Sequence, residues 1–178
     1  MKTGKTVKVL LTAATAAGML AGCGSKTDTD TFRFASELDI QGMDSTVVDD
    51  GMSFNAIHAI TDGLTAVNEK GKTAPAIAKS WDVSDDGKTY TFHLRDAKWT
   101  NGDKVTANDF VYSWRKIIKD AGNYAYMLGS GGASVKNADA LMELGANATD
   151  EQMATLGVTA KDDKTLVVEL ENKVPYFT

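Results

Sequence analysis

The chain has 178 residues, of which 43% are hydrophobic and 24% are charged, a composition typical of a folded globular protein of about one domain. Its formal net charge of −5 argues against nucleic acid as a partner. No apolar run reaches the roughly eighteen residues that a membrane-spanning helix needs.

Residues 1–22 have the order of a secretory signal peptide. Lysines at positions 2, 5 and 8 precede an uncharged apolar run at 9–20, and small residues follow it. A short buried helix at the start of a cytosolic domain is the alternative. Because the run lacks a polar face and is too short to span a bilayer, we expect a signal peptide that takes no part in the fold.

The only cysteine, Cys23, ends the sequence Leu20-Ala21-Gly22-Cys23. This order resembles the bacterial lipobox, in which the thiol receives a diacylglyceryl group and the cysteine becomes the first mature residue. An ordinary secretory signal with an incidental cysteine is the alternative. Loss of the three lysines takes the net charge from −5 to −8, so attachment to the membrane would depend on acyl chains rather than on charge. We therefore expect a lipid anchor at Cys23, on the extracytoplasmic side of the cell membrane, and a flexible tether at 23–30.

The first part of the body is expected to contain a strand, a helix and a hairpin. Alternation predicts a short strand at 31–34, and helical spacing of apolar residues predicts a helix over 52–64. His58 lies beside the apolar stripe. It could be a ligand or a base, but with no second His or Cys to pair with it we expect a surface or boundary position on the helix.

An Asp-Gly pair at 86–87 separates two alternating runs and predicts a β-hairpin. Tyr90, Phe92 and Leu94 should share its apolar face, and His93 should lie on the polar face in solvent or in a cross-strand contact. A second tight turn is expected at Asn101-Gly102.

The spacing of Thr106 and Asp109 is that of a capping box and predicts the start of a helix that runs to about Lys119. We expect its apolar stripe to face the core rather than a ligand; the stripe consists of Phe110, Trp114, Ile117 and Ile118.

A glycine-rich stretch at 129–132 is either a mobile surface loop or part of a cleft. It lacks the Gly-Lys-Ser/Thr ending of a phosphate loop, so nucleotide binding is not supported. Thr149 and Gln152 predict the start of another helix, with Gly157 as its stop. Residues 158–172 predict a second hairpin, and we expect both hairpins in one mixed sheet.

One long block carries a family pattern. Between Ala74 and Trp114 the sequence has Ala-x-Ser-Trp, an acidic turn, Tyr-Thr-Phe-x-Leu-Arg, Lys-Trp, a Gly-Asp turn, Val-Thr-Ala and Asp-Phe-Val-Tyr-Ser-Trp. With the later block LGVTAKDDKTLVVELENKVPYF, this pattern resembles the extracellular solute-binding proteins of family 5, which serve oligopeptide ABC transporters. The resemblance covers residues 31–178, with gaps near 129–150.

The resemblance implies an α/β fold: the N-terminal part of a two-lobed, class II periplasmic-binding-protein-like architecture, with a mixed sheet, hairpins and flanking helices. It implies a clamp that binds oligopeptides through their backbone and delivers them to an ABC transporter permease. A lipid-anchored receptor for signalling peptides or adhesion shares this fold and remains open. Members of the family are far longer, so residues 31–178 are expected to be an incomplete peptide-binding domain.

The same resemblance implies that two stretches face the peptide. One is Asp49, Asp50 and Gly51, and the other is Tyr124 with Tyr126. A solvated loop and packed tyrosines are the alternatives. The family's acidic anchor for the peptide N-terminus lies outside this chain, so we expect the chain alone to bind peptide weakly or not at all.

No pattern in the chain indicates catalysis. There is no Gly-x-Ser-x-Gly elbow and no His-Glu-x-x-His, and the two histidines and one cysteine make no metal-ligand set. The acidic pairs at 85–86 and 162–163 fall in turns, where solvated carboxylates are ordinary. We expect neither an enzyme nor a bound cofactor or metal.

Overall fold

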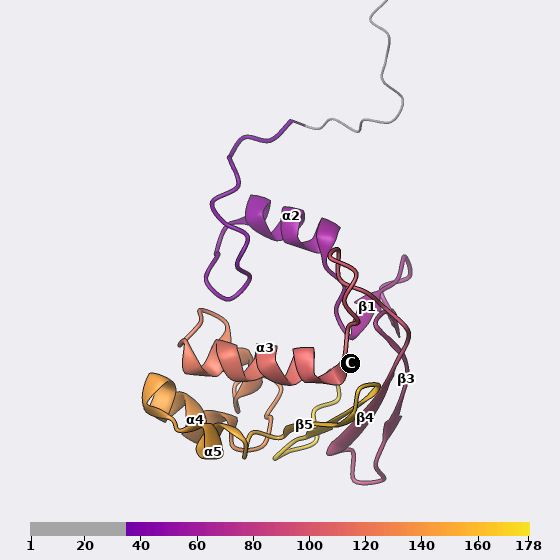
Figure 1. The fold of residues 1–178 in the computed structure, drawn as a ribbon, viewed down its shortest axis with the longest axis vertical. Coiled ribbons are helices and arrows are strands. Elements are labelled where there is room, and N and C mark those ends of the chain that lie inside the picture. The colour runs from indigo at the N-terminus through magenta and orange to yellow at the C-terminus, as the bar shows by residue number, and fades with distance from the viewer. Residues whose placement is uncertain (1–34) are drawn as a thin grey trace, which may run out of the picture. The chain divides into compact units, whose positions relative to one another are not determined.

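The structure is a computed structural model that describes residues 35–178, and residues 38–178 form one unit within it. The predicted signal peptide, Cys23, the tether and the strand at 31–34 lie outside the described residues. The helices, in chain order, are α2 (Gly51–Ile60), α3 (Ala107–Lys119), the 3₁₀ helix η1 (Ala125–Leu128), α4 (Ala138–Leu144), the 3₁₀ helix η2 (Gly145–Asn147) and α5 (Asp150–Met153) (Figure 1). The strands are β1 (Thr65–Val67), β2 (Thr73–Pro75), β3 (Ala78–Val83), β4 (Thr89–Leu94), β5 (Val158–Asp162) and β6 (Thr165–Glu169).

Both predicted hairpins are confirmed, and they join in one four-stranded sheet of order β3-β4-β6-β5. Every pairing between the described strands is antiparallel, although a mixed sheet was expected. The reason lies in the crossover: the chain passes from β4 through α3, α4 and α5 to β5, and β6 then inserts between these two strands. β4 and β5 therefore run in the same direction without being neighbours. β1 and β2 form a separate two-stranded sheet.

The turns of the two hairpins are built alike. In each turn an aspartate accepts a hydrogen bond from the backbone N–H two residues later, Asp86 from Lys88 at 3.0 Å and Asp162 from Lys164 at 2.7 Å. Hydrogen bonding lowers the pKa of both carboxyls, chiefly from the Ser84 side chain at Asp86 and from the Lys164 backbone at Asp162. These acidic residues thus lie in turns, as the sequence predicted, and their hydrogen bonds stabilise those turns.

The inner face of the sheet forms the core against α3. Tyr90, Phe92 and Leu94 are buried on this face, as predicted. His93 lies on the outer face, where its Nε2 is 2.8 Å from Asp82 Oδ2 on the neighbouring strand, so the predicted cross-strand contact is confirmed. The largest fully buried side chains are Phe92, Ile118, Leu156, Leu166, Val135, Val158 and Val168.

Helix α3 begins where the capping box predicts. The Asp109 carboxylate accepts the Thr106 backbone N–H at 2.7 Å, and the helix packs on β5 and β6 (Figure 1). The deepest contacts differ from the predicted stripe. Ile118 is buried as expected, but Phe110 and Trp114 are half-buried at the margin of the core.

Two helix ends differ from prediction, and one helix was not expected. Helix α2 ends at Ile60 rather than at 64, because Thr61 is extended and both its N–H and its hydroxyl donate to the Ile57 carbonyl. Helix α5 ends at Met153, and Gly157 has another role: it allows the chain to pass close to Lys136 and the Glu169 carbonyl. Helix α4 was not predicted.

Candidate functional site

The structure brings together the two stretches that the sequence indicated as peptide-facing. Asn123, directly before Tyr124, donates its backbone N–H to the Thr46 carbonyl at 2.8 Å. Its side-chain Nδ2 donates to the next carbonyl, that of Val47, at 2.6 Å. Asn123 and Val47 are 76 positions apart in the sequence. We call the four residues Thr46, Val47, Gly122 and Asn123 the joint.

The loop on one side of the joint owes its shape to Asp44. Asp44 Oδ1 accepts the backbone N–H of Thr46 at 2.9 Å and its hydroxyl at 2.7 Å, and these two bonds shape the turn directly before the Thr46 and Val47 carbonyls. These hydrogen bonds lower the pKa of Asp44. The Lys116 ammonium lies 2.6 Å from Asp120 and 3.9 Å from Asp44, and the hydrogen bond that it donates to Asp120 is the main cause of its raised pKa.

Asp50 has a structural role in the start of α2. Its Oδ1 accepts the Ser53 backbone N–H at 2.8 Å, and hydrogen bonds from Ser53 lower the pKa of the Asp50 carboxyl. The buried Ser53 hydroxyl oxygen accepts the backbone N–H groups of Gln41 and Gly42 at 3.0 and 3.2 Å. Gly51 is the exposed first residue of the helix.

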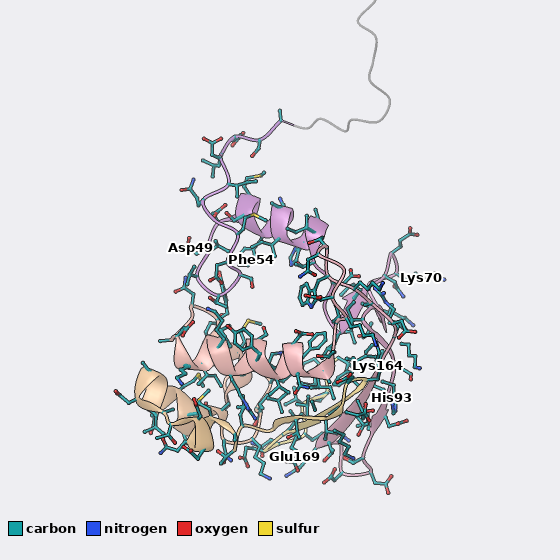
Figure 2. The ribbon with its side chains drawn as sticks, in the orientation of Figure 1. Asp49, Phe54, Lys70, His93, Lys164 and Glu169 are labelled. Atoms are coloured by element: carbon teal, nitrogen blue, oxygen red, sulfur yellow. The ribbon has the colours of Figure 1, made fainter. Side chains whose placement is uncertain are left out.

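Asp49 and the two tyrosines lie around the joint in different states of burial. Asp49 is exposed on the segment that enters α2 (Figure 2). Tyr124 is half-buried and packs edge-on against Phe54 of α2, with ring centroids 5.5 Å apart at 70°. Tyr126 is 60% exposed. The exposed Asp49 and Tyr126 can contact a ligand directly, whereas Asp50 and Tyr124 also hold the local structure.

The glycine-rich stretch forms a tight turn. A Cβ at Gly129 would overlap the Asp139 carboxylate, and a Cβ at Gly132 would overlap the Met127 carbonyl. The Ser130 N–H donates to both Asp139 oxygens, at 3.0 and 3.1 Å. The glycines therefore permit close backbone approach beside η1.

A cavity of about 990 Å³ opens between α2 and α3, and sequence reasoning missed it. Its apolar wall includes Ile57 of α2, Phe110 and Trp114 of α3, and Phe177. None of the predicted peptide-facing residues at 49–51, 124 and 126 is in this wall, but His58 and Gly132 are. The apolar stripe that contains the half-buried Phe110 and Trp114 was the sequence signal for this cavity, but it was interpreted as facing the core.

Two further kinds of feature, a metal-ligand cluster and a membrane-spanning helix, are absent from the part of the chain that the structure describes. Among residues 35–178 there is no cluster of three or more His, Cys, Asp or Glu side chains that could hold a metal ion. Over the same residues, no helix combines the length and the apolar character needed to cross a membrane.

The profile of the bacterial extracellular solute-binding proteins, family 5 Middle, matches residues 72–178. The chain belongs to this family. The match contains both hairpins, α3 and Tyr124. It therefore covers the whole four-stranded sheet and one side of the joint, Gly122 and Asn123. The recognition made from the block at 74–114 is thereby confirmed, as is the α/β fold class.

Relatives within family 5 support the same assignment. A dipeptide-binding protein of Lactococcus lactis is 39% identical over 99% of this chain. The crystal structure of Haemophilus influenzae OppA in complex with the peptide RPPGFSPFR has a TM-score of 0.69 and 39% identity over 77% of this chain. The structure of the pheromone receptor PrgZ has a TM-score of 0.68 and 32% identity over 78%.

The chain spans only part of each relative. It covers 31% of the Lactococcus protein and 26% of each of the two solved chains. What these comparisons show for residues 38–178 is therefore the family and the fold of one part of a family 5 protein.

Proposed function

We propose that this chain is part of a solute-binding protein that captures oligopeptides outside the cell and delivers them to the permease of an ABC transporter. The observation that carries the proposal is the family 5 match over residues 72–178. The relatives named for dipeptide binding and crystallised with a nine-residue peptide support peptides as the ligand class.

The site geometry suits binding rather than catalysis. The exposed Asp49 carboxylate can pair with a cationic group of a peptide, and the exposed Tyr126 ring offers an apolar face to its chain. Recognition of an extended backbone tolerates many sequences, which is what an importer of varied peptides needs. Asp50, Gly51 and Tyr124 complete the proposed site by shaping its two sides.

Saturation-transfer NMR with the peptide RPPGFSPFR tests this proposal, because the method detects millimolar binding. We expect transfer to the peptide that saturates with concentration, and weaker transfer when Tyr126→Ala is used. Tyr112→Ala, on the exposed side of α3, is the matched control. Tyr112 is also an exposed tyrosine, 68% exposed, but it lies outside the proposed site, so its loss should leave transfer unchanged. Transfer that stays the same in Tyr126→Ala would count against the proposed site, whereas absence of transfer from the unaltered chain would agree with the expectation that this part of a family 5 protein does not hold peptide by itself.

The proposed domain organisation places residues 1–22 in a signal peptide, Cys23 at the lipid anchor, 23–30 in a tether and 31–178 in the peptide-binding domain. The lipobox sequence at 20–23 supports it. Cys23→Ser should abolish labelling of the protein by radioactive palmitate and leave an unprocessed precursor or a released protein. Labelling that is the same in Cys23→Ser would contradict the anchor.

A receptor for signalling peptides is the second candidate, and the likeness to the pheromone receptor PrgZ favours it. The range of bound peptides separates the two functions. A transporter component should bind peptides of unrelated sequence with similar affinity, whereas a receptor should prefer one sequence strongly.

A further inference from the structure

We infer that Asn123 is a positioning residue for peptide binding, which holds the loop at 43–50 and the segment at 124–126 together as one surface. The inference rests on the proposed function and adds to it a residue that sequence reasoning did not select. Asn123 itself need not touch the peptide.

Asn123 is suited to this role by the two bonds that it makes. Its backbone N–H and its Nδ2 bind consecutive carbonyls, those of Thr46 and Val47, at 2.8 and 2.6 Å. Two donors on consecutive acceptors fix both the distance and the rotation between the two segments. A single bond would fix only the distance.

The joint also has a close backbone contact behind these bonds. Gly122 is buried, and a Cβ added there would lie 2.9 Å from the Thr46 carbonyl oxygen and 2.8 Å from Ile117 Cγ1. The two segments can therefore meet only because residue 122 lacks a side chain.

The joint adjoins both sides of the proposed site. Tyr124 follows Asn123 directly, and its carbonyl accepts the Met127 N–H at 3.0 Å within η1. On the other segment, the buried Val48 separates Val47 from the exposed Asp49. Movement at the joint would thus change the separation of Asp49 from the tyrosines.

A purely stabilising role is the alternative, and burial separates the two possibilities. Asn123 is exposed, so removing its amide leaves no cavity in the core. Loss of the Nδ2 bond should therefore change peptide affinity while the sheet keeps its stability.

The test uses the full chain with Asn123→Asp, which keeps the size of the side chain but replaces the Nδ2 donor with an acceptor facing the Val47 carbonyl. Asn123→Ala removes the same donor without adding charge. Asn68→Asp is the matched control, because it adds the same charge in the β1–β2 turn. There the backbone N–H groups of Lys70 and Lys72 donate to the Oδ1 of Asn68, an acceptor that aspartate keeps.

Affinity for RPPGFSPFR is measured by saturation-transfer titration, and amide hydrogen exchange is followed in the same samples. We expect Asn123→Asp and Asn123→Ala to weaken binding about fivefold, the effect of one lost hydrogen bond, and Asn68→Asp to bind like the unaltered chain. Exchange should rise at Val48 and Asn123 and stay unchanged at Phe92 and Val168 in the sheet.

The possible results are distinguishable. Unchanged affinity in Asn123→Asp and Asn123→Ala overturns the inference and leaves the proposed function in place. Faster exchange throughout the sheet, in step with the loss of affinity, overturns it in favour of a stabilising role. If the unaltered chain itself does not bind the peptide, a peptide-binding surface at the joint fails for this chain and the inference fails with it, whereas peptide capture by a complete family 5 protein is unaffected.

Discussion

Two regions within residues 38–178 are held together in different ways. The sheet body, which we define as β3–β6 with α3, contains fully buried side chains such as Phe92, Leu166 and Ile118. The loop–α2 segment, residues 38–61, buries mainly Val48, Ser53 and Ile57. Its shape depends instead on hydrogen bonds at Asp44, Asp50 and the joint.

This difference predicts which of the two regions should unfold locally first. Buried apolar area contributes most of the free energy of unfolding, whereas exposed hydrogen bonds contribute little each. The loop–α2 segment should therefore open locally at a lower free energy than the sheet body. The proposed peptide site lies at the border of the two regions, with Asp49 in the segment and Tyr126 outside it.

The largest expected effect comes from a cavity in the sheet body. Phe92→Ala should lower the free energy of unfolding by about 3–5 kcal/mol, because the ring is 2% exposed and packs near Trp81, Tyr90 and Phe177. Ile57→Ala in α2 should cost less, about 1–2 kcal/mol, since α2 has fewer buried neighbours. Urea denaturation measures both, and equal costs would contradict the smaller contribution of burial expected in α2.

Gly122→Ala should disturb the contact between the regions. The new Cβ would meet the Thr46 carbonyl and the Ile117 side chain at less than van der Waals distance, so we expect a loss of about 1–3 kcal/mol. Hydrogen exchange should be faster at Asn123 and Val48 than in β4. Gly131→Ala is the control, because an added Cβ there meets nothing within 4 Å.

The sheet body could be predicted from sequence because its signals are local. The Asp-Gly turn at 86–87 and the Thr106–Asp109 capping box each fix a boundary within a few residues. The four-strand order could not be read in this way, since the place of β6 between β4 and β5 depends on pairing between residues far apart in the sequence.

The candidate site was predictable only in part. Resemblance indicated Asp49, Asp50, Gly51, Tyr124 and Tyr126, but Asp50 is also an N-cap. No local pattern marks Asn123, whose partners are two backbone carbonyls of a distant loop. The cavity was missed because an apolar helix stripe looks the same whether it faces a core or a cavity.

Acid should weaken the loop–α2 segment. The folded-state pKa values of Asp44 and Asp50 lie below their ordinary 3.8, so both carboxylates stabilise the fold above that pH, and this contribution is lost as the pH falls through the lower folded values. The raised pKa of Lys116 acts at the alkaline end and does not oppose this loss. Exchange at Val48, corrected for its intrinsic rate and compared at about pH 6 and about pH 3, should show opening at the lower pH. Asp44→Asn should show a smaller pH dependence; an identical dependence would remove Asp44 from the explanation.

The smallest expected effect is a gain in stability at the end of α3, next to the joint. Ala121 ends α3 in the left-handed conformation, with φ of 50°, and the Gly122 and Ala121 N–H groups bind the Ile117 and Ile118 carbonyls in the pattern of a Schellman cap. Glycine has no steric cost in this conformation, so Ala121→Gly should stabilise the fold by about 0.5 kcal/mol after its greater freedom in the unfolded chain is subtracted. Ala154→Gly is the matched control: residue 154 is also an exposed helix-end alanine, but its φ of −67° is right-handed, so glycine there should destabilise by about 0.5–1 kcal/mol. Opposite signs in urea denaturation would show that backbone conformation at residue 121, rather than loss of a methyl group, sets the stability of the cap on which the joint is built.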